Sequence, residues 1–115
     1  MSVTIYHNPQ CSKSRQTLAL LEQRGIKPKI IEYLVTPPTE AELKHLVKLL
    51  GITPRELLRR KEVEYRQAKL DSHEIPDAEI IRAMVRHPRL IERPIVVAGN
   101  KAALGRPPEN VLKIL

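Results

Sequence analysis

Cysteine and the large aromatic residues are scarce in this sequence. Its 115 residues include one cysteine, three tyrosines, and neither phenylalanine nor tryptophan. A single cysteine cannot form a disulfide within the chain, which excludes the small secreted folds that disulfides hold together. The N-terminus lacks the basic and apolar segments of a signal peptide, and no apolar run approaches the roughly 20 residues of a membrane-spanning helix. We therefore expect a cytoplasmic protein with no membrane partner.

Positive charge is in excess. Twenty Lys and Arg against thirteen Asp and Glu give a formal net charge of +7, which suits nucleic acid, an anionic membrane or a small anionic substrate. Proteins that bind single-stranded nucleic acid stack its bases on aromatic side chains, and three tyrosines offer little such surface. We therefore expect no nucleic-acid partner.

The first third of the chain predicts a βαβ unit. Strand-like residues 2–6 and 27–34 flank a helical pattern at residues 11–24, which ends at Gly25. Short connections in this order are typical of two parallel strands with a crossover helix.

A block of helices and a β-hairpin are predicted in the rest of the chain. The pairs Thr39/Glu42 and Thr53/Glu56 have the spacing of helix capping boxes. A further helix is expected at residues 77–86, and Gly99-Asn100 has the composition of a hairpin turn. We therefore expect a single α/β domain over residues 1–115, with a mixed four-stranded sheet and a helical block inserted between the second strand and the later hairpin.

The only cysteine lies where the first strand gives way to the first helix, in the segment YHNPQCSKSR. Backbone N–H groups at a helix N-terminus carry partial positive charge, which favours the thiolate of Cys11 over the thiol. The Ser14 hydroxyl could donate to the sulfur, and His7, if protonated, would add a cation. Capping of the helix by Ser14 and an ordinary loop position for His7 are the structural alternatives. The position of Cys11 at the start of a helix by itself predicts a nucleophile, whatever the roles of Ser14 and His7.

Two known cysteine motifs are absent from this segment. A phosphatase loop requires arginine six residues after the cysteine, where this chain has Thr17, and a dithiol oxidoreductase requires a second cysteine at Ser14. A covalent bond formed at Cys11 must therefore be resolved by an external thiol.

Three arginines are candidate ligands for an oxyanion, namely Arg59 in ELLRRK, Arg93 in ERPIVV and Arg106 in GRPP. The guanidinium group is planar, permanently charged and able to donate paired hydrogen bonds to an oxyanion. A lone arginine is more often a surface residue, and the sequence by itself does not bring the three together.

Five segments carry a resemblance to a known family: IYHNPQCSKSRQTL, YLVTPPTEAEL, LLRRKEVEYR, HPRLIERPIVV and GRPPENVLKIL. In this order they resemble the glutaredoxin-coupled arsenate reductases, the single-cysteine branch of the thioredoxin-like families. The resemblance implies a thioredoxin-like fold and the following roles: Cys11 as nucleophile, Arg59, Arg93 and Arg106 as oxyanion ligands, His7 and Ser14 as residues that favour the thiolate, and Pro94 as the site of a cis peptide bond.

The resemblance also implies a reaction and its partners. The Cys11 thiolate would attack arsenate, or a related small oxyanion, and glutathione would reduce the adduct to arsenite. Glutaredoxin would then remove the mixed disulfide. No bound cofactor or metal is implied, and we expect a monomer. Ser12-Lys13 departs from the smaller residues that follow the cysteine in the family, and Lys13 could alter oxyanion selectivity.

Two alternatives belong to other functional classes. Spx-type regulators bind RNA polymerase and share this fold, but they commonly carry a Cys-x-x-Cys switch, which Ser14 removes here. A monothiol thiol–disulfide oxidoreductase without arsenate activity is compatible with the fold and the single cysteine.

Overall fold

A computed structural model of the chain describes residues 2–115, which form two compact units. The first unit comprises the described residues up to Thr36 together with Arg93–Leu115, and the second comprises Pro37–Glu92. The helical block that the sequence predicts between the second strand and the hairpin is confirmed, and it forms the second unit. The expectation of a single domain over residues 1–115 stays a prediction.

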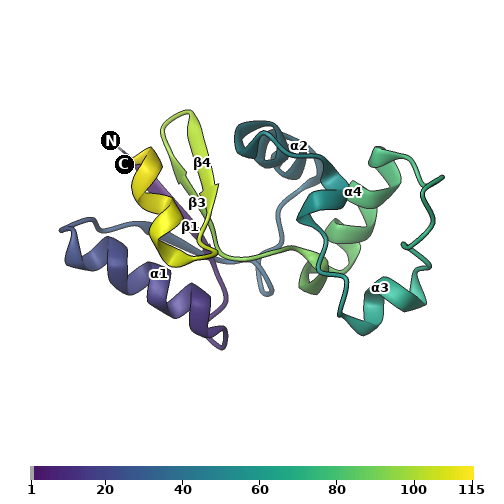
Figure 1. Ribbon diagram of the computed structural model, residues 1–115, viewed down its shortest axis with the longest axis horizontal. Helices are drawn as coiled ribbons and strands as arrows, with labels where there is room; N and C mark the ends of the chain where they lie inside the picture. The colour runs from purple at the N-terminus through teal and green to yellow at the C-terminus, as the bar shows by residue number, and fades with distance from the viewer. Residues whose placement is uncertain (1) are drawn as a thin grey trace. The chain divides into compact units, whose positions relative to one another are not determined.

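The first unit is a four-stranded mixed sheet with helical segments on one face (Figure 1). Its strands lie in the order β2-β1-β3-β4, with β1 parallel to β2 and antiparallel to β3, and with β3 antiparallel to β4. The predicted parallel pair and hairpin are both confirmed. The elements are β1 Val3–His7, α1 Ser12–Gln23, β2 Lys29–Glu32, β3 Ile95–Ala98, β4 Lys101–Leu104 and the 3₁₀ segment η3 Pro108–Ile114.

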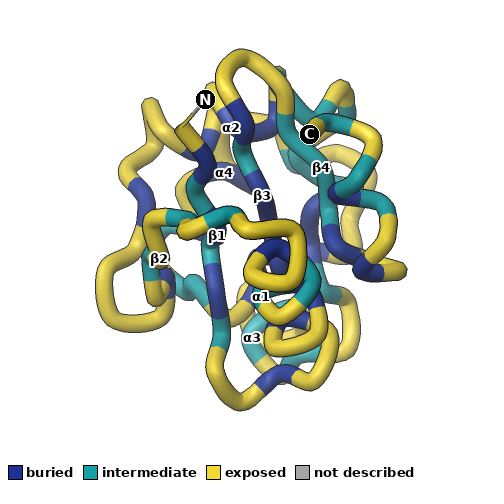
Figure 2. Tube along the Cα trace, turned by 90° about the vertical axis from the view of Figure 1, so that its left-hand side faces the viewer, coloured by how far each residue is buried: buried dark blue, intermediate teal, exposed yellow. Residues whose placement is uncertain are grey.

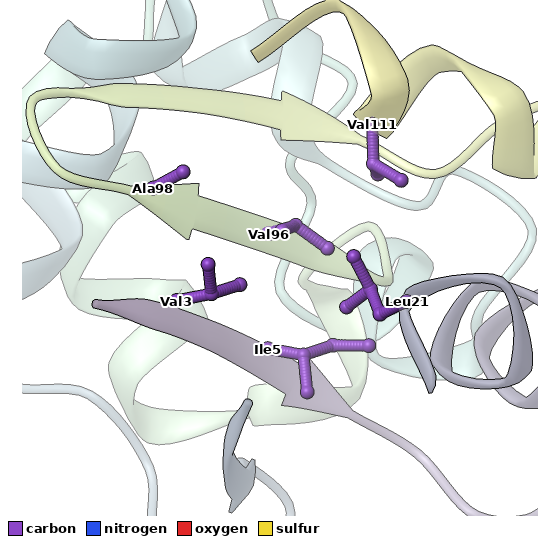
Figure 3. Close-up of a cluster of buried hydrophobic side chains, with 6 residues drawn as sticks. All are labelled: Val3, Ile5, Leu21, Val96, Ala98 and Val111. Atoms are coloured by element: carbon purple, nitrogen blue, oxygen red, sulfur yellow. The ribbon is translucent and has the colours of Figure 1, made fainter. Parts of the chain in front are cut away.

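A hydrophobic cluster packs the helical segments of this unit against the sheet (Figure 3). Leu21 of α1 and Val111 of η3 are both fully buried in it. They pack against inward-facing side chains of β1 and β3, namely Val3, Ile5, Val96 and Ala98. The shared cluster places α1 and η3 on the same face of the sheet.

Burial alternates along β1, and this alternation reaches the loop that carries Cys11. Val3, Ile5 and His7 are buried while the residues between them are half-buried. Because successive side chains of a strand point to opposite faces, His7 shares its face with Val3 and Ile5, the face that α1 covers. Figure 2 shows the contrast with the edge strand β2, which is mostly exposed.

The second unit is helical, and its helices begin as the sequence predicts. The Thr39 hydroxyl accepts from the Glu42 N–H at 3.1 Å, and a Glu42 carboxylate oxygen accepts from the Thr39 N–H at 3.0 Å. Thr53 and Glu56 form a second box, although it starts a short 3₁₀ segment instead of an α-helix. The elements are α2 Glu40–Leu50, η1 Pro54–Leu57, α3 Val63–Gln67, α4 Asp77–Arg86 and η2 Pro88–Leu90. Within residues 2–115, no helix is both long enough and apolar enough to cross a membrane.

Leu21 is expected to be a main anchor of α1. Leu21→Ala should lower the free energy of unfolding by about 2–5 kcal/mol, because it removes a fully buried side chain and leaves a cavity. Urea denaturation measures this change. The matched control is Leu115→Ala, whose leucine is 39% exposed and should cost about 1 kcal/mol or less. Equal losses in the two variants would contradict the placement of Leu21 in the core.

Candidate active site

Three strand ends meet next to Cys11. The strand pairing sets Tyr6, near the end of β1, opposite Ile95 at the start of β3. Ile95 in turn lies opposite Leu104 at the end of β4. The segments that follow β1, precede β3 and follow β4 therefore lie at one edge of the first unit, and they contain His7 to Cys11, Arg93-Pro94 and Gly105-Arg106.

Cys11 occupies the N-cap position of α1. Its backbone is extended, with φ −96° and ψ 124°, and its N–H donates to the Asn8 carbonyl at 3.0 Å, which closes the loop after β1. The first intrahelical hydrogen bond runs from the Arg15 N–H to the Cys11 carbonyl, also at 3.0 Å. The side chain is 8% exposed, so the sulfur stands at the open end of a 12-residue helix with little access to solvent.

The pKa of the Cys11 thiol is lowered by its surroundings. Burial alone raises this pKa, but three influences together outweigh burial: the Ser14 N–H, the charge and side-chain hydrogen bond of Arg93, and the Lys13 N–H. Within the described chain, the sulfur accepts no capping hydrogen bond of standard geometry, so the two N–H groups act mainly through their partial charges. These surroundings shift the Cys11 equilibrium toward the thiolate, the direction expected from its position at the start of a helix, and its role as the nucleophile stays a prediction.

The Ser14 hydroxyl is engaged with His7 and Asn8. Its Oγ lies 2.6 Å from His7 Nδ1 and accepts from the Asn8 N–H at 3.0 Å. Ser14 is fully buried, and it acts on the sulfur through its backbone N–H. This differs from the expected hydroxyl donor to Cys11, because the hydroxyl satisfies the buried histidine and the loop backbone instead. A role of Ser14 in favouring the thiolate stays a prediction.

The imidazole of His7 is driven toward its neutral form. Burial lowers the pKa of His7, the neighbouring Glu32 carboxylate raises it, and the Arg15 guanidinium lowers it, with a net lowering. A protonated His7, which would add a cation beside the sulfur, is therefore disfavoured, and a role of His7 in favouring the thiolate stays a prediction. His7 is 6% exposed, and the structure places it as a buried hydrogen-bond partner of Ser14.

Arg93 and Arg106 lie next to one another at this edge of the sheet. The Arg106 guanidinium donates to the Arg93 carbonyl at 3.3 Å, and the Gly105 N–H donates to the Pro94 carbonyl at 3.0 Å. The Arg93–Pro94 peptide bond is cis, the geometry expected at Pro94. The first unit thus brings together Cys11, His7, Ser14, Arg93, Pro94 and Arg106.

Arg59 belongs to the second unit and pairs there with carboxylates. An antiparallel bridge between Leu58 and Ile91 places the arginine so that its N–H donates to the Leu90 carbonyl at 2.8 Å. Its guanidinium lies 2.7 Å from Glu62 Oε1 and 4.0 Å from Glu92 Oε1. The predicted role of Arg59 as an oxyanion ligand stays a prediction.

Arg15 has a structural function in the loop that carries Cys11. Its Nη1 donates to the Pro9 carbonyl at 2.9 Å, which ties the loop after β1 to the first turn of α1. Its charge also contributes to the lowered pKa of His7. In the sequence, the sign of this function is the position of Arg15 four residues after Cys11, which places both residues on one face of the helix.

A metal site is not part of this arrangement. Across residues 2–115, no group of three or more His, Cys, Asp or Glu side chains is placed to hold a metal ion. The chemistry that the described residues offer is that of one activated thiol beside guanidinium groups.

Comparisons with known proteins identify similar chains. The family model described as the ArsC family matches residues 6–114. The protein named arsenate reductase of Haemophilus influenzae is 52% identical and aligns over 100% of both chains. The uncharacterized protein YfgD of Escherichia coli K12 is 51% identical over 98% of this chain and 96% of its own.

A solved structure supports the thioredoxin-like fold as well. The structure described as arsenate reductase from Vibrio cholerae is 53% identical and superposes with a TM-score of 0.97. The match covers 100% of this chain and 98% of that chain. The predicted fold class, a thioredoxin-like mixed sheet with an inserted helical block, is confirmed.

Arg93→Ala should raise the pKa of Cys11, because the variant loses a charge and a hydrogen bond that favour the thiolate. The rate of alkylation by iodoacetamide, measured against pH, should reach its half-maximum at higher pH than in wild type. At strongly alkaline pH the two rates should be equal, because both thiols are then ionised.

The matched control for this measurement is Arg24→Ala, which removes an exposed arginine from the end of α1 farthest from Cys11. Its alkylation profile should coincide with that of wild type. An Arg93→Ala profile that also coincides with wild type would show that Arg93 does not act on the sulfur.

Proposed function

The chain belongs to the ArsC family, and we propose that it is an arsenate reductase that takes its electrons from glutathione and glutaredoxin. One observation carries this proposal. The chain's only thiol lies at a helix N-terminus and receives a hydrogen bond from the Arg93 guanidinium, so a nucleophile and an anion-binding group occupy one site. The names of similar proteins and the matched family model support arsenate as the substrate.

The first step joins sulfur to arsenic. The Cys11 thiolate attacks the arsenic atom of arsenate, an S–As bond forms, and one As–O bond breaks. The departing oxygen leaves as water after protonation, and arsenic remains As(V). The lowered pKa of Cys11 raises the fraction of attacking thiolate at neutral pH.

The guanidinium groups stabilise the charge on the arsenate oxygens during this step. Arg93 and Arg106 lie side by side, and each offers several N–H donors to a tetrahedral oxyanion. The resemblance to the family assigns the same role to Arg59, and this assignment is part of the proposal. His7 and Ser14 hold the loop after β1 through their mutual hydrogen bond and so keep the sulfur in place.

The second step transfers two electrons. The thiolate of glutathione attacks the sulfur of Cys11, an S–S bond forms, and the S–As bond breaks with its electron pair retained by arsenic. Arsenic is thereby reduced from As(V) to As(III) and leaves as arsenite. Cys11 and glutathione are together oxidised to a mixed disulfide, which balances the two electrons.

The single cysteine requires an external partner for the last step. Glutaredoxin would attack the glutathione sulfur of the mixed disulfide and release the Cys11 thiolate. This chemistry needs a reducing compartment, which places the protein in the cytoplasm as part of the proposal. The proposed enzyme acts as a monomer and holds no resident cofactor.

Cys11→Ser should abolish arsenate reduction, because a serine hydroxyl is not ionised at neutral pH and forms no disulfide. The assay combines purified protein, arsenate, glutathione and glutaredoxin, and follows arsenite formation. A matched control is Ser12→Ala, an exposed neighbour of Cys11, which should keep most of the activity. Equal arsenite formation by Cys11→Ser and wild type would refute the role of the thiol.

Arg106→Ala should raise the KM for arsenate about 10-fold or more, since it removes a charged donor to the substrate. The kcat at saturating arsenate should change less than KM. Arg59→Ala in the same assay tests whether the arginine of the second unit also contacts the oxyanion.

The same variants separate the alternatives. A monothiol oxidoreductase would remove glutathione from a glutathionylated peptide without arsenate, and loss of Arg106 would not impair that reaction. Retention of RNA polymerase on immobilised protein, with no arsenite formed by wild type, would favour the Spx-like regulator.

A further inference from the structure

Gly105 lies where a side chain has no room. It is buried at the end of β4, and a Cβ built on it would stand 2.4 Å from Thr17 Oγ1, 2.8 Å from Pro94 Cγ and 3.0 Å from Thr17 Cγ2. Ordinary van der Waals contacts of a Cβ lie at 3.4–4 Å. Its backbone needs no left-handed conformation, unlike Gly25, Gly51 and Gly99. The reason for glycine at this position is therefore close approach and not backbone freedom.

One side of this contact belongs to the helix that carries the nucleophile. Thr17 is fully buried on α1, and its hydroxyl donates to the Lys13 carbonyl one turn earlier at 2.8 Å. Lys13 in turn directs its backbone N–H toward the Cys11 sulfur. Thr17 thus packs against the backbone at Gly105, and its hydroxyl is hydrogen-bonded to the first turn of α1, next to the thiol.

The other side of the contact belongs to the segments that carry the arginines. The Gly105 N–H donates to the Pro94 carbonyl at 3.0 Å, so Gly105 is fixed to the residue that follows Arg93. Gly105 is also followed directly by Arg106, whose guanidinium donates to the Arg93 carbonyl. A shift of α1 away from Gly105 would therefore separate Cys11 from both arginines.

We propose that Gly105 is a positioning residue: the close contact of its backbone with Thr17 fixes how near α1, and with it Cys11, lies to Arg93 and Arg106. Part of this inference rests on the proposed function, because the arsenate readout assumes an arsenate reductase. The geometric part does not, because the distance between the thiol and Arg93 can be probed by alkylation alone.

The expected effect is large for a single methyl group. To restore ordinary contact distances, Thr17 and residue 105 must move apart by about 1 Å. Misplacement of a catalytic group by about 1 Å can reduce a reaction rate about 100-fold. Gly105→Ala should therefore raise the pKa of the Cys11 thiol and lower kcat/KM for arsenate about 10- to 100-fold, with a raised KM.

The test compares Gly105→Ala with two further variants of the full chain. Gly25→Ala is the matched control, since its Cβ meets nothing within 4 Å although its φ of +74° strains an alanine. It should lower the melting temperature and leave the alkylation profile and the KM for arsenate unchanged. The double variant Thr17→Ala/Gly105→Ala removes both Thr17 atoms of the contact and leaves only Pro94 Cγ at 2.8 Å. It should bring the alkylation profile most of the way back to wild type.

Each result bears on the proposal. A folded Gly105→Ala with the wild-type alkylation profile would overturn it, as would a double variant that shows no recovery. If Gly105→Ala fails to fold, the double variant decides: recovery of folding and of the thiol supports the proposal, and failure to fold overturns it. A shifted alkylation profile in Gly105→Ala, with no arsenate reduction by wild type, would refute the proposed function and leave the positioning role intact.

Discussion

The proposed chemistry depends on one interaction, that of the Arg93 guanidinium with the nearly buried sulfur of Cys11. Burial by itself raises the pKa of Cys11 and would keep it a neutral thiol. The Ser14 N–H, Arg93 and the Lys13 N–H outweigh that effect. The positive charge that favours the thiolate therefore comes from backbone N–H groups at a helix end and from one side chain. The same guanidinium suits an incoming oxyanion. The low exposure that makes ionisation difficult also strengthens each compensating interaction, because nearby charges are less screened there.

The sheet topology brings the segments that carry Cys11, Arg93 and Arg106 together. Antiparallel neighbours place the end of one strand beside the start of the next, and the order β2-β1-β3-β4 brings the end of β1, the start of β3 and the end of β4 to one edge. Cys11 follows the first of these strands, Arg93 precedes the second, and Arg106 follows the third. The backbone contact at Gly105 sets how closely the helix of the nucleophile approaches the other two segments.

Because the chain has a single thiol, the proposed reaction needs thiols from other molecules. In the proposed reaction the chain offers the nucleophile and the charge that stabilises an oxyanion, and the hydrogen-bonded pair of His7 and Ser14 lies buried beside them. It offers no second thiol, so the proposed arsenate reduction must draw its electrons from thiols outside the chain. Within the second unit, Arg59 already pairs with the Glu62 carboxylate. An anion that used Arg59 would have to compete with that carboxylate.

Local patterns in the sequence determined the elements and the place of the thiol. Capping boxes, the Gly99 turn and the apolar periodicities depend on residues a few positions apart, and they predicted α2, the hairpin and Cys11 at a helix start. The site depended on contacts between distant segments. The partner of the Ser14 hydroxyl, the neutral tendency of His7, the hydrogen bond from Arg93 to the sulfur and the lack of space at Gly105 follow from burial and strand register. These were decided only by the tertiary structure, because residues far apart in the chain meet only after the sheet has formed and α1 has packed on it.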